Sequence, residues 1–464
     1  MMFHIVERYD FFFNILRQAA GEEAAMVRGN RAMNFTRVRG LGVSRATVRV
    51  GLIGAGKFGS MFLAQVPTTT GLEVVAIADL NPEAARKSCL NVGWPAGKLE
   101  KTRITRDAFE LIASPDVDVI VEATGHPAAG IAHAREAIAQ RKHIVMVNVE
   151  ADVLAGPLLA RQAAEQGVVY TLAYGDQPAL ICEMVDWARD CGFSVIAAGK
   201  GTKYLPVFHT STPETVWSYR GVRPEDAAKG GMNAQMFNSF IDGTKSAIEM
   251  AAVSNATGLM ANPDGLRFPP ASVSDLPETL SVGPGKLHHR GQVEVVSSVH
   301  RDGSTVENNL RWGVYVVFEA PNEYTKRCFR EYGVITDSNG TLAALHRPFH
   351  LIGLELNVSI FAAALHGQAT GHPIGFHSDV VATAKRDIAP GEILDGEGGY
   401  LVWGRLMPAA DSLRIGGLPI GLASNVRIVR PVRAGQSLTW GDVELNVNDE
   451  TYRFRREMER VFAD

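Results

Sequence analysis

Three glycines that directly follow a short apolar run are the clearest chemical signal in the sequence. The run Val48–Ile53 leads into Gly54-x-Gly56-x-x-Gly59, and a predicted helix continues from Ser60. In such a turn the first glycine permits a sharp bend. The second lets backbone N–H groups approach a pyrophosphate, and the third lets the helix pack closely on the strand. Because a helix N-terminus also attracts anions, this segment predicts a dinucleotide-binding turn.

An acidic residue at the end of the next predicted strand, Leu72–Ala78, supports this prediction. Asp79 follows that strand, twenty residues after Gly59. A carboxylate at this spacing typically accepts hydrogen bonds from the adenosine ribose. The two features together predict a domain that binds a nicotinamide nucleotide.

Small or polar residues also follow two further predicted strands, Val117–Val121 and His143–Val147. Since the carboxyl ends of parallel strands meet at one edge of a sheet, we expect these residues to line the same crevice as the glycine turn. A carboxylate at this edge could serve as a base or could only line the nicotinamide pocket. The predicted cofactor contacts are Gly54, Gly56, Lys57, Phe58, Gly59, Asp79, Arg86, Glu122, Thr124, Gly125 and Asn148.

Two clusters further along the chain could act on a substrate. Lys200 and Lys203 lie at the end of a β-like run, and glycines flank the first of them. Two cations in such a loop suit a phosphate or a carboxylate, or they can polarise a carbonyl group. A solvated basic loop is the alternative interpretation.

The second cluster lies in residues 233–252, which the pattern predicts as one long helix. Asn238, Asp242, Lys245 and Glu249 would share one face of it, because they recur at i, i+4, i+7 and i+11. This amide, two carboxylates and an ammonium could bind a substrate and move protons. A solvated helix face with an Asp-x-x-Lys pair is the alternative.

The predicted strands and helices that position these residues follow three different patterns along the chain. Alternating apolar strands and helices up to Leu172 predict an α/β fold, a Rossmann-type doubly wound parallel sheet. Mixed α+β segments follow, and from about residue 375 short strands with Gly/Pro turns predict a small all-β module. We therefore divide the chain into an N-terminal arm (1–46), a dinucleotide-binding domain (47–175), a catalytic and dimerisation domain (176–375) and a C-terminal module (376–464).

Composition limits the classes of partner. The 464 residues carry a formal net charge of −4, so no polyanion-binding signature is present, and we expect no nucleic-acid partner. Four scattered cysteines and the lack of a long apolar stretch predict a cytoplasmic protein without a membrane contact.

The apolar segment Leu351–Leu365, a predicted helix, would pack on the core or on a second subunit, and we expect a homodimer.

The motifs together resemble the SAF-domain oxidoreductases of the homoserine-dehydrogenase-like superfamily, over about residues 50–460. The matching segments are Val50–Gly59, Val121-Glu122-Ala123-Thr124-Gly125, Tyr174-Gly175-Asp176-Gln177-Pro178, Gly199–Lys203, Asp242-Gly243-Thr244-Lys245 and a SAF-like module from Asp379. Within that group the chain resembles the 1-deoxy-D-xylulose 5-phosphate reductoisomerase-like enzymes, which make 2-C-methyl-D-erythritol 4-phosphate for isoprenoid biosynthesis.

This resemblance implies an NADPH-dependent reductoisomerase that acts on a sugar phosphate. Lys200 and Lys203 would hold oxygen charge and phosphate, Lys245 would assist, and Asp242 or Glu249 would relay protons. A divalent cation is loosely implied, for which Glu150, Asp152, Asp242 and Glu249 are the available oxygen ligands.

The cofactor preference and the reaction both have alternatives. Asp79 favours a free ribose hydroxyl and hence NADH, although Arg86 and Lys87 could offset it at a 2′-phosphate. The alternative reaction is that of a plain NAD(P)-dependent dehydrogenase of a homoserine-like or sugar-acid substrate with the same cofactor cleft. A nucleotide-sensing binding protein is the alternative from a different class.

Overall fold

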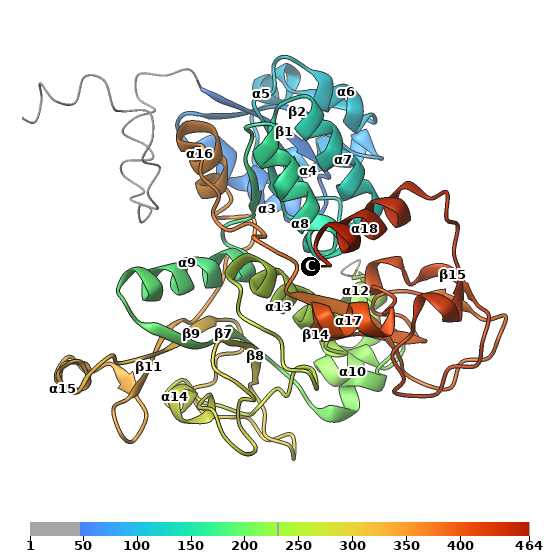
Figure 1. Ribbon diagram of the computed structural model, residues 1–464. Helices are drawn as coiled ribbons and strands as arrows, with labels where there is room; N and C mark the ends of the chain where they lie inside the picture. Colours follow the sequence, from blue (N-terminus) through green and yellow to red (C-terminus); the bar gives the residue numbers. More distant parts are fainter. Residues whose placement is uncertain (1–46, 230–231, 464) are drawn as a thin grey trace, which may run out of the picture. The chain divides into compact units, whose positions relative to one another are not determined.

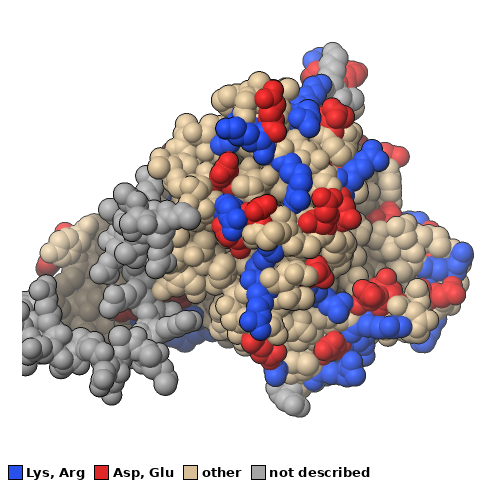
Figure 2. All heavy atoms as spheres, turned by 90° about the horizontal axis from the view of Figure 1, so that it is seen from above, with Lys and Arg blue, Asp and Glu red and all other residues tan. Residues whose placement is uncertain are grey.

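A computed structural model describes residues 47–229 and 232–463. The predicted arm, residues 1–46, lies outside the described residues. Among the described residues, no helix is long and apolar enough to cross a membrane. On the face drawn in Figure 2, acidic and basic side chains are interspersed over the surface.

The first part of the chain, at the top of Figure 1, forms a parallel six-stranded sheet. Its strand order is β3-β2-β1-β4-β5-β6. Two clusters of buried apolar residues cover its two faces, and this confirms the predicted doubly wound α/β fold. The strands are β1 (Val48–Ile53), β2 (Leu72–Ala78), β3 (Arg103–Thr105), β4 (Val119–Glu122), β5 (His143–Met146) and β6 (Tyr170–Leu172). The helices are α3 (Lys57–Gln65), α4 (Pro82–Asn91), α5 (Ala96–Lys101), α6 (Ala108–Ala113), α7 (Pro127–Ala139) and α8 (Val149–Glu165).

The apolar segment near residue 360 returns to this sheet. Its helix is α16 (Asn357–His366), which contacts β4, β5 and β6 (Figure 1). Ile360 and Phe361 are buried in the same cluster as Val121 and Val145. Since the apolar side of α16 is covered within the chain, it gives no reason for a second subunit, and the homodimer stays a prediction.

The middle part of the chain is built on a mixed sheet in the order β10-β11-β9-β7-β8, with α9 packed against β7 and β9. Its strands are β7 (Ser194–Thr202), β8 (Gln292–Ser297), β9 (Val314–Glu319), β10 (Ile335–Thr336) and β11 (Leu342–Arg347). Its helices are α9 (Gln177–Asp190), α10 (Val216–Arg220), α11 (Pro224–Lys229), α12 (Ala234–Ile241), α13 (Thr244–Thr257), α14 (Leu276–Thr279) and α15 (Glu323–Glu331).

The long helix predicted over residues 233–252 is wrong, because the chain bends between α12 and α13. Gly243 has a left-handed backbone with φ of +91°, which costs glycine nothing. Asp242 fixes the bend, since its Oδ1 accepts a hydrogen bond from the backbone N–H of Thr244 at 2.9 Å. Asn238 and Asp242 therefore do not share a helix face with Lys245.

The C-terminal part contains small antiparallel sheets, but it is not all-β as expected. One sheet pairs β12 (Ser378–Ala384) with β14 (Val402–Pro408). Another joins β13 (Ile393–Asp395), β15 (Ser424–Ile428) and β16 (Val443–Glu444). Two helices accompany them: α17 (Ala409–Ile415) packs on β12 and β14, and α18 (Glu450–Val461) packs on α8 (Figure 1). Most residues of α18 are charged, so the sequence pattern did not predict this helix. Its short apolar stripe consists of Phe454 and Met458.

A buried arginine ties α18 to the rest of the molecule. The guanidinium of Arg455 donates hydrogen bonds to Asp379 Oδ2 at 2.6 Å, to Glu459 Oε1 at 2.9 Å and to the carbonyl of Leu154 at 3.2 Å. The side chains of Arg455 and Asp379 are 0% and 1% exposed. One side chain thus connects α18, β12 and α8.

We expect Arg455→Met to lower the free energy of unfolding by about 3–5 kcal/mol, because it leaves the carboxylate of Asp379 buried without its cation. Urea unfolding followed by circular dichroism measures this loss. Arg460→Met, on the exposed side of the same helix, is the control and should change little. Equal stability of the Arg455 variant and the wild type would contradict the assignment.

Candidate functional site

The glycine turn forms an open cradle at the N-terminus of α3. A Cβ on Gly54 would lie 2.7 Å from the carbonyl oxygen of Ala123, and one on Gly59 would lie 2.5 Å from that of Gly54. Both positions therefore require glycine. A Cβ on Gly56 would meet no atom within 4 Å, so space is open beside the backbone N–H groups that begin α3. These residues fit a pyrophosphate.

Asp79 braces this turn from the end of β2. Its Oδ2 accepts a hydrogen bond from the N–H of Ala55, and its Oδ1 accepts one from the N–H of Asn81, each at 2.8 Å. A carboxylate has further lone pairs, so the partly exposed group can still accept a ribose hydroxyl. Arg86 and Lys87 are exposed on α4.

The predicted contacts after β4 and β5 are bonded to one another. Thr124 Oγ1 donates to Glu122 Oε1 at 2.6 Å, and His133 Nδ1 lies 3.2 Å from the same oxygen. The side chain of Asn148 caps α8 and donates to the carbonyl of His126 at 3.0 Å. Glu122 is fully buried, and its carboxylate contacts the side chains of Thr124 and His133. Sequence reasoning missed His133, which no local motif marks.

Five charged residues from four segments converge next to this edge, and we call them the polar centre. They are Glu150 in the first turn of α8, Asp176 before α9, Lys200 on β7, and Lys245 and Glu249 one turn apart on α13. The ammonium of Lys245 contacts Glu150 Oε1, and that of Lys200 contacts Glu249 Oε2. Glu150 and Asp176 lie just beyond the carboxyl ends of β5 and β6, where a nicotinamide ring would lie.

The two ion pairs of the polar centre differ in access. The side chains of Lys245 and Glu150 are 17% and 14% exposed, whereas those of Lys200 and Glu249 are 7% and 5% exposed. A substrate can therefore reach Lys245 more readily than Lys200. This makes Lys245 the better candidate for direct contact.

The charges of the polar centre shift the pKa values of Lys245 and Asp176. Burial opposes the charged form of Lys245, but the carboxylates of Glu150, Glu249, Glu397 and Asp176 together raise its pKa above the ordinary value. Lys245 therefore remains an ammonium at neutral pH. Burial, with the nearby charge of Glu249, raises the pKa of Asp176 to about 6. Such a carboxyl can exchange a proton near neutral pH.

Three half-buried cations lie near one another beyond the end of β7, and we call them the cation cluster: Lys203, Arg220 and Arg311. Lys203 donates to the carbonyl of Tyr219 at 2.7 Å, and its pKa is lowered by burial and by the charges of Arg311 and Arg220. None of these three side chains forms an ion pair with a carboxylate in the described ranges. Such a group suits an anion. Sequence reasoning found only Lys203, because the arginines lie far from it along the chain.

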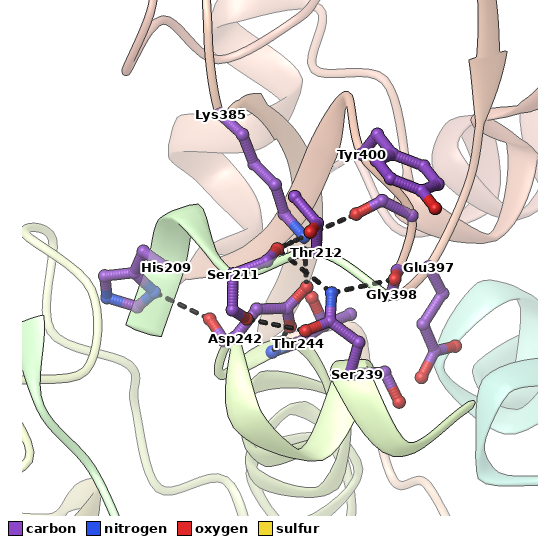
Figure 3. A network of polar contacts seen from close by, with 12 residues as sticks. His209, Ser211, Thr212, Ser239, Asp242, Thr244, Lys385, Glu397, Gly398 and Tyr400 are labelled. Atoms are coloured by element: carbon purple, nitrogen blue, oxygen red, sulfur yellow. Dashed lines mark hydrogen bonds and ion pairs between the residues drawn. The ribbon is translucent and has the colours of Figure 1, made fainter. Parts of the chain in front are cut away.

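The structure places Asp242 in a different environment from the one expected for a proton relay. Its Oδ2 accepts a hydrogen bond from Lys385 Nζ at 2.8 Å, and both side chains are almost completely buried (Figure 3). Lys385 also donates to the carbonyls of Ser211 and Gly399, each at 2.7 Å. Both oxygens of Asp242 are thus bonded within the protein. The pair joins the start of α13 to the C-terminal part.

The four oxygen ligands considered for a divalent cation do not form one metal-binding group. Glu150 contacts Lys245, Glu249 contacts Lys200, Asp242 contacts Lys385, and Asp152 contacts Tyr170. In the described part of the chain, no group of three or more His, Cys, Asp or Glu side chains is placed to hold a metal ion.

Asp152 is a buried carboxyl within the α/β part. Its Oδ1 accepts a hydrogen bond from the hydroxyl of Tyr170 at 2.8 Å, and its Oδ2 has no partner among the described residues. Burial raises the pKa of Asp152 to about 7, although the bond from Tyr170 opposes this change. At neutral pH a large share of Asp152 is therefore protonated.

Two family models match consecutive parts of the chain. Residues 52–172 match the NAD-binding domain of homoserine dehydrogenase, and residues 175–356 match the catalytic domain of oxidoreductase DRL. The first match covers the glycine turn, and the second covers Lys200, Lys203, Lys245 and Glu249. Together they identify an oxidoreductase with a nucleotide-binding domain.

Individual relatives match only parts of this chain. An inositol 2-dehydrogenase from Acidothermus cellulolyticus is 34% identical over 113 residues, which are 24% of this chain and 31% of that protein. The matched segment thus spans about a third of this curated relative. A scyllo-inositol dehydrogenase from Lactobacillus casei (14% identity, TM-score 0.27) aligns over 38% of this chain and 49% of its own. A biliverdin reductase from Synechocystis with NADP+ (22% identity, TM-score 0.25) aligns over 34% and 48%.

These findings correct the expectation of a reductoisomerase for isoprenoid biosynthesis. The curated relative is an inositol dehydrogenase, and the catalytic-domain match is to an oxidoreductase. The alternative of a plain dehydrogenase agrees better with both. NADPH was expected only through the reductoisomerase resemblance, so the choice between NADH and NADPH is open again.

The state of Asp152 gives a prediction for stability. A carboxyl whose pKa is higher in the folded protein than in the unfolded chain stabilises the fold at low pH, and this contribution is lost as pH rises through the folded value, about 7. Asp152→Asn keeps an acceptor for Tyr170 and cannot ionise. Since the unfolded carboxyl ionises near its ordinary value of about 4, the unfolding free energy of the wild type should fall relative to that of the variant between about pH 4 and about pH 7 and then level off. Parallel pH profiles in urea unfolding would contradict this account.

Proposed function

We propose that this protein is an NAD(H)-dependent dehydrogenase of a small hydroxylated substrate that carries an anionic group, such as a sugar acid. The observation that carries the proposal is the polar centre, in which Lys245, the more exposed of its two lysines, lies near the carboxyl edge of the nucleotide-binding sheet. The bound cofactor would supply the hydride chemistry, and the chain supplies the groups that hold the substrate and its charge.

In this proposal Lys245 acts on the reacting oxygen. Its ammonium is held by Glu150 and stays protonated because of the surrounding carboxylates. It can donate a hydrogen bond to a substrate carbonyl and, during reduction, a proton to the developing alkoxide. Asp176, with its pKa of about 6, can return a proton to this site near neutral pH.

The cation cluster supports an anionic substrate. Lys203, Arg220 and Arg311 form no ion pair with a carboxylate among the described residues, and Lys203 follows Lys200 of the polar centre by three positions. A carboxylate or phosphate bound there would be contacted by cations from three separate segments. A neutral polyol would leave them unpaired.

Asp79 supports NADH as the cofactor. Its carboxylate lies beside the glycine turn, where it can accept a ribose hydroxyl and would repel a 2′-phosphate. The cofactor residues named from the sequence therefore suit NADH better than NADPH.

Three further assignments remain proposals: a SAF-like module, a cytoplasmic location and a homodimer. The small antiparallel sheets of residues 376–463 support a SAF-like module. The scattered cysteines support a cytoplasmic location. The homodimer has no support from α16, and light scattering tests it.

Steady-state assays with NAD+ and NADP+ test the proposed function. We expect reduction of NAD+ with a sugar acid, weaker activity with NADP+, and no turnover with neutral inositols. The absorbance of the reduced nicotinamide measures each rate. Turnover confined to neutral polyols, or a strong preference for NADP+, would contradict the proposal.

Lys245→Met should lower kcat by roughly a hundred- to a thousandfold, as expected when one hydrogen bond to a developing oxyanion is lost. NADH binding, measured by fluorescence titration, should stay within a few-fold of the wild type. Lys326→Met removes a lysine from the Lys326–Glu323 ion pair on α15 and is the matched control. An unchanged kcat in the folded Lys245 variant would move the chemistry away from α13.

Arg311→Gln should raise KM for the anionic substrate roughly ten- to a hundredfold, because one charge-assisted hydrogen bond is lost. The change in kcat should be smaller, since this contact holds the substrate at a distance from the reacting oxygen. The exposed Arg327→Gln on α15 is the control. If KM were the same in both variants, the cation cluster would not be the anion site.

A further inference from the structure

A cavity lies on the other side of α13 from the polar centre. It has a volume of about 310 Å³ and is lined by His209, Gly243, Ala247, Asp264, Gly265, Leu266, Phe268, Thr383, Trp403, Arg405, Leu406 and Gly435. Gly243 and Ala247 form its α13 wall, whereas Lys245 and Glu249 of the same helix belong to the polar centre. The cavity is therefore distinct from the proposed active site.

The β12–β14 pair gives this cavity a floor that is partly aromatic and partly charged. Trp403 lies opposite Thr383 in the antiparallel register, and Arg405 is two residues further along β14, so all three share one face. The ring of His209 stacks on Trp403 with centroids 3.8 Å apart. The result is a flat surface next to a guanidinium.

His209 is held rigidly and is neutral. Its Nδ1 donates to the carbonyl of Asp242 at 2.7 Å, and its Nε2 accepts from the hydroxyl of Tyr204 at 2.8 Å (Figure 3 shows the contact with Asp242). Burial, with smaller effects of Lys385 and Arg405, lowers the pKa of His209 to about 4. It therefore adds a stacking surface but no charge.

Arg405 is the cation that faces this cavity without a carboxylate partner. Among the described residues it forms no ion pair, and its one hydrogen bond is a 3.5 Å contact with the carbonyl of Pro263. Lys385, whose charge also affects His209, is already paired with Asp242. A single guanidinium fork matches a carboxylate in two-point geometry and balances its one charge.

From these contacts we propose that the cavity is a second ligand site for a small aromatic carboxylate. The ring lies against Trp403, and the carboxylate pairs with Arg405. The exposed carboxylate of Asp264, at the same cavity, accepts a hydrogen bond from a ring hydroxyl. This site does not depend on the identity of the substrate.

Isothermal titration with benzoate and 4-hydroxybenzoate tests the proposal on the full chain. Both probes should bind at millimolar concentration or below, and 4-hydroxybenzoate should bind several-fold more tightly than benzoate. Asp264→Asn, which removes the charge of the acceptor, should reduce this difference. Saturating NADH and the Lys245→Met change should leave both affinities within a few-fold of the wild type, because the polar centre lies across α13.

Two variants localise the binding. Arg405→Gln should weaken both probes at least tenfold, and the exposed Arg414→Gln on α17 is the matched control. Ala247→Met extends a flexible side chain from α13 into the cavity and should block binding while all charges remain. No binding of either probe to the folded wild type would overturn the proposal. It would also be overturned if NADH or Lys245→Met abolished binding while Arg405→Gln did not.

Discussion

Helix α13 is buried along almost its whole length and nevertheless carries two charged side chains. Twelve of its fourteen residues are buried, and it contacts α8, α9, β8, β12 and β14. A charge removed from water costs several kcal/mol unless a partner compensates it. Lys245 is compensated by Glu150 of α8, and Glu249 by Lys200 of β7. Helix α8 of the nucleotide-binding part and strand β7 of the mixed sheet must both contact α13 before its charges are satisfied.

The same constraint explains why the C-terminal part is integrated with the rest of the chain. Asp242, just before α13, is paired with Lys385 at the end of β12, and Arg455 of α18 is paired with Asp379 at the start of β12. Each of these side chains is almost completely buried. The C-terminal part therefore fixes the start of α13, and through it the position of Lys245.

The sequence predicted those features whose cause is local. The glycine turn and the alternating apolar strands depend on neighbouring residues, and both lie where they were expected. The polar centre depends on contacts between distant segments: Lys200 and Glu249 are 49 positions apart, and Lys245 and Glu150 are 95 apart. Arg220 and Arg311 could not be linked to Lys203 for the same reason. The helical periodicity misled at Asp242, because the left-handed Gly243 ends one helix and lets the next begin in another direction.

The central claim is that the polar centre is the place where a nicotinamide ring meets its substrate. A crystal structure with NAD+ tests this claim most directly. The account predicts that the pyrophosphate lies over Gly56 and that the nicotinamide ring lies beside Thr124 and Asn148. Its reactive face should then be turned to Lys245, leaving room for a substrate between them at contact distances of about 3–3.5 Å. A nicotinamide ring directed away from α13, with Lys245 and Glu150 closed off from it, would contradict the account.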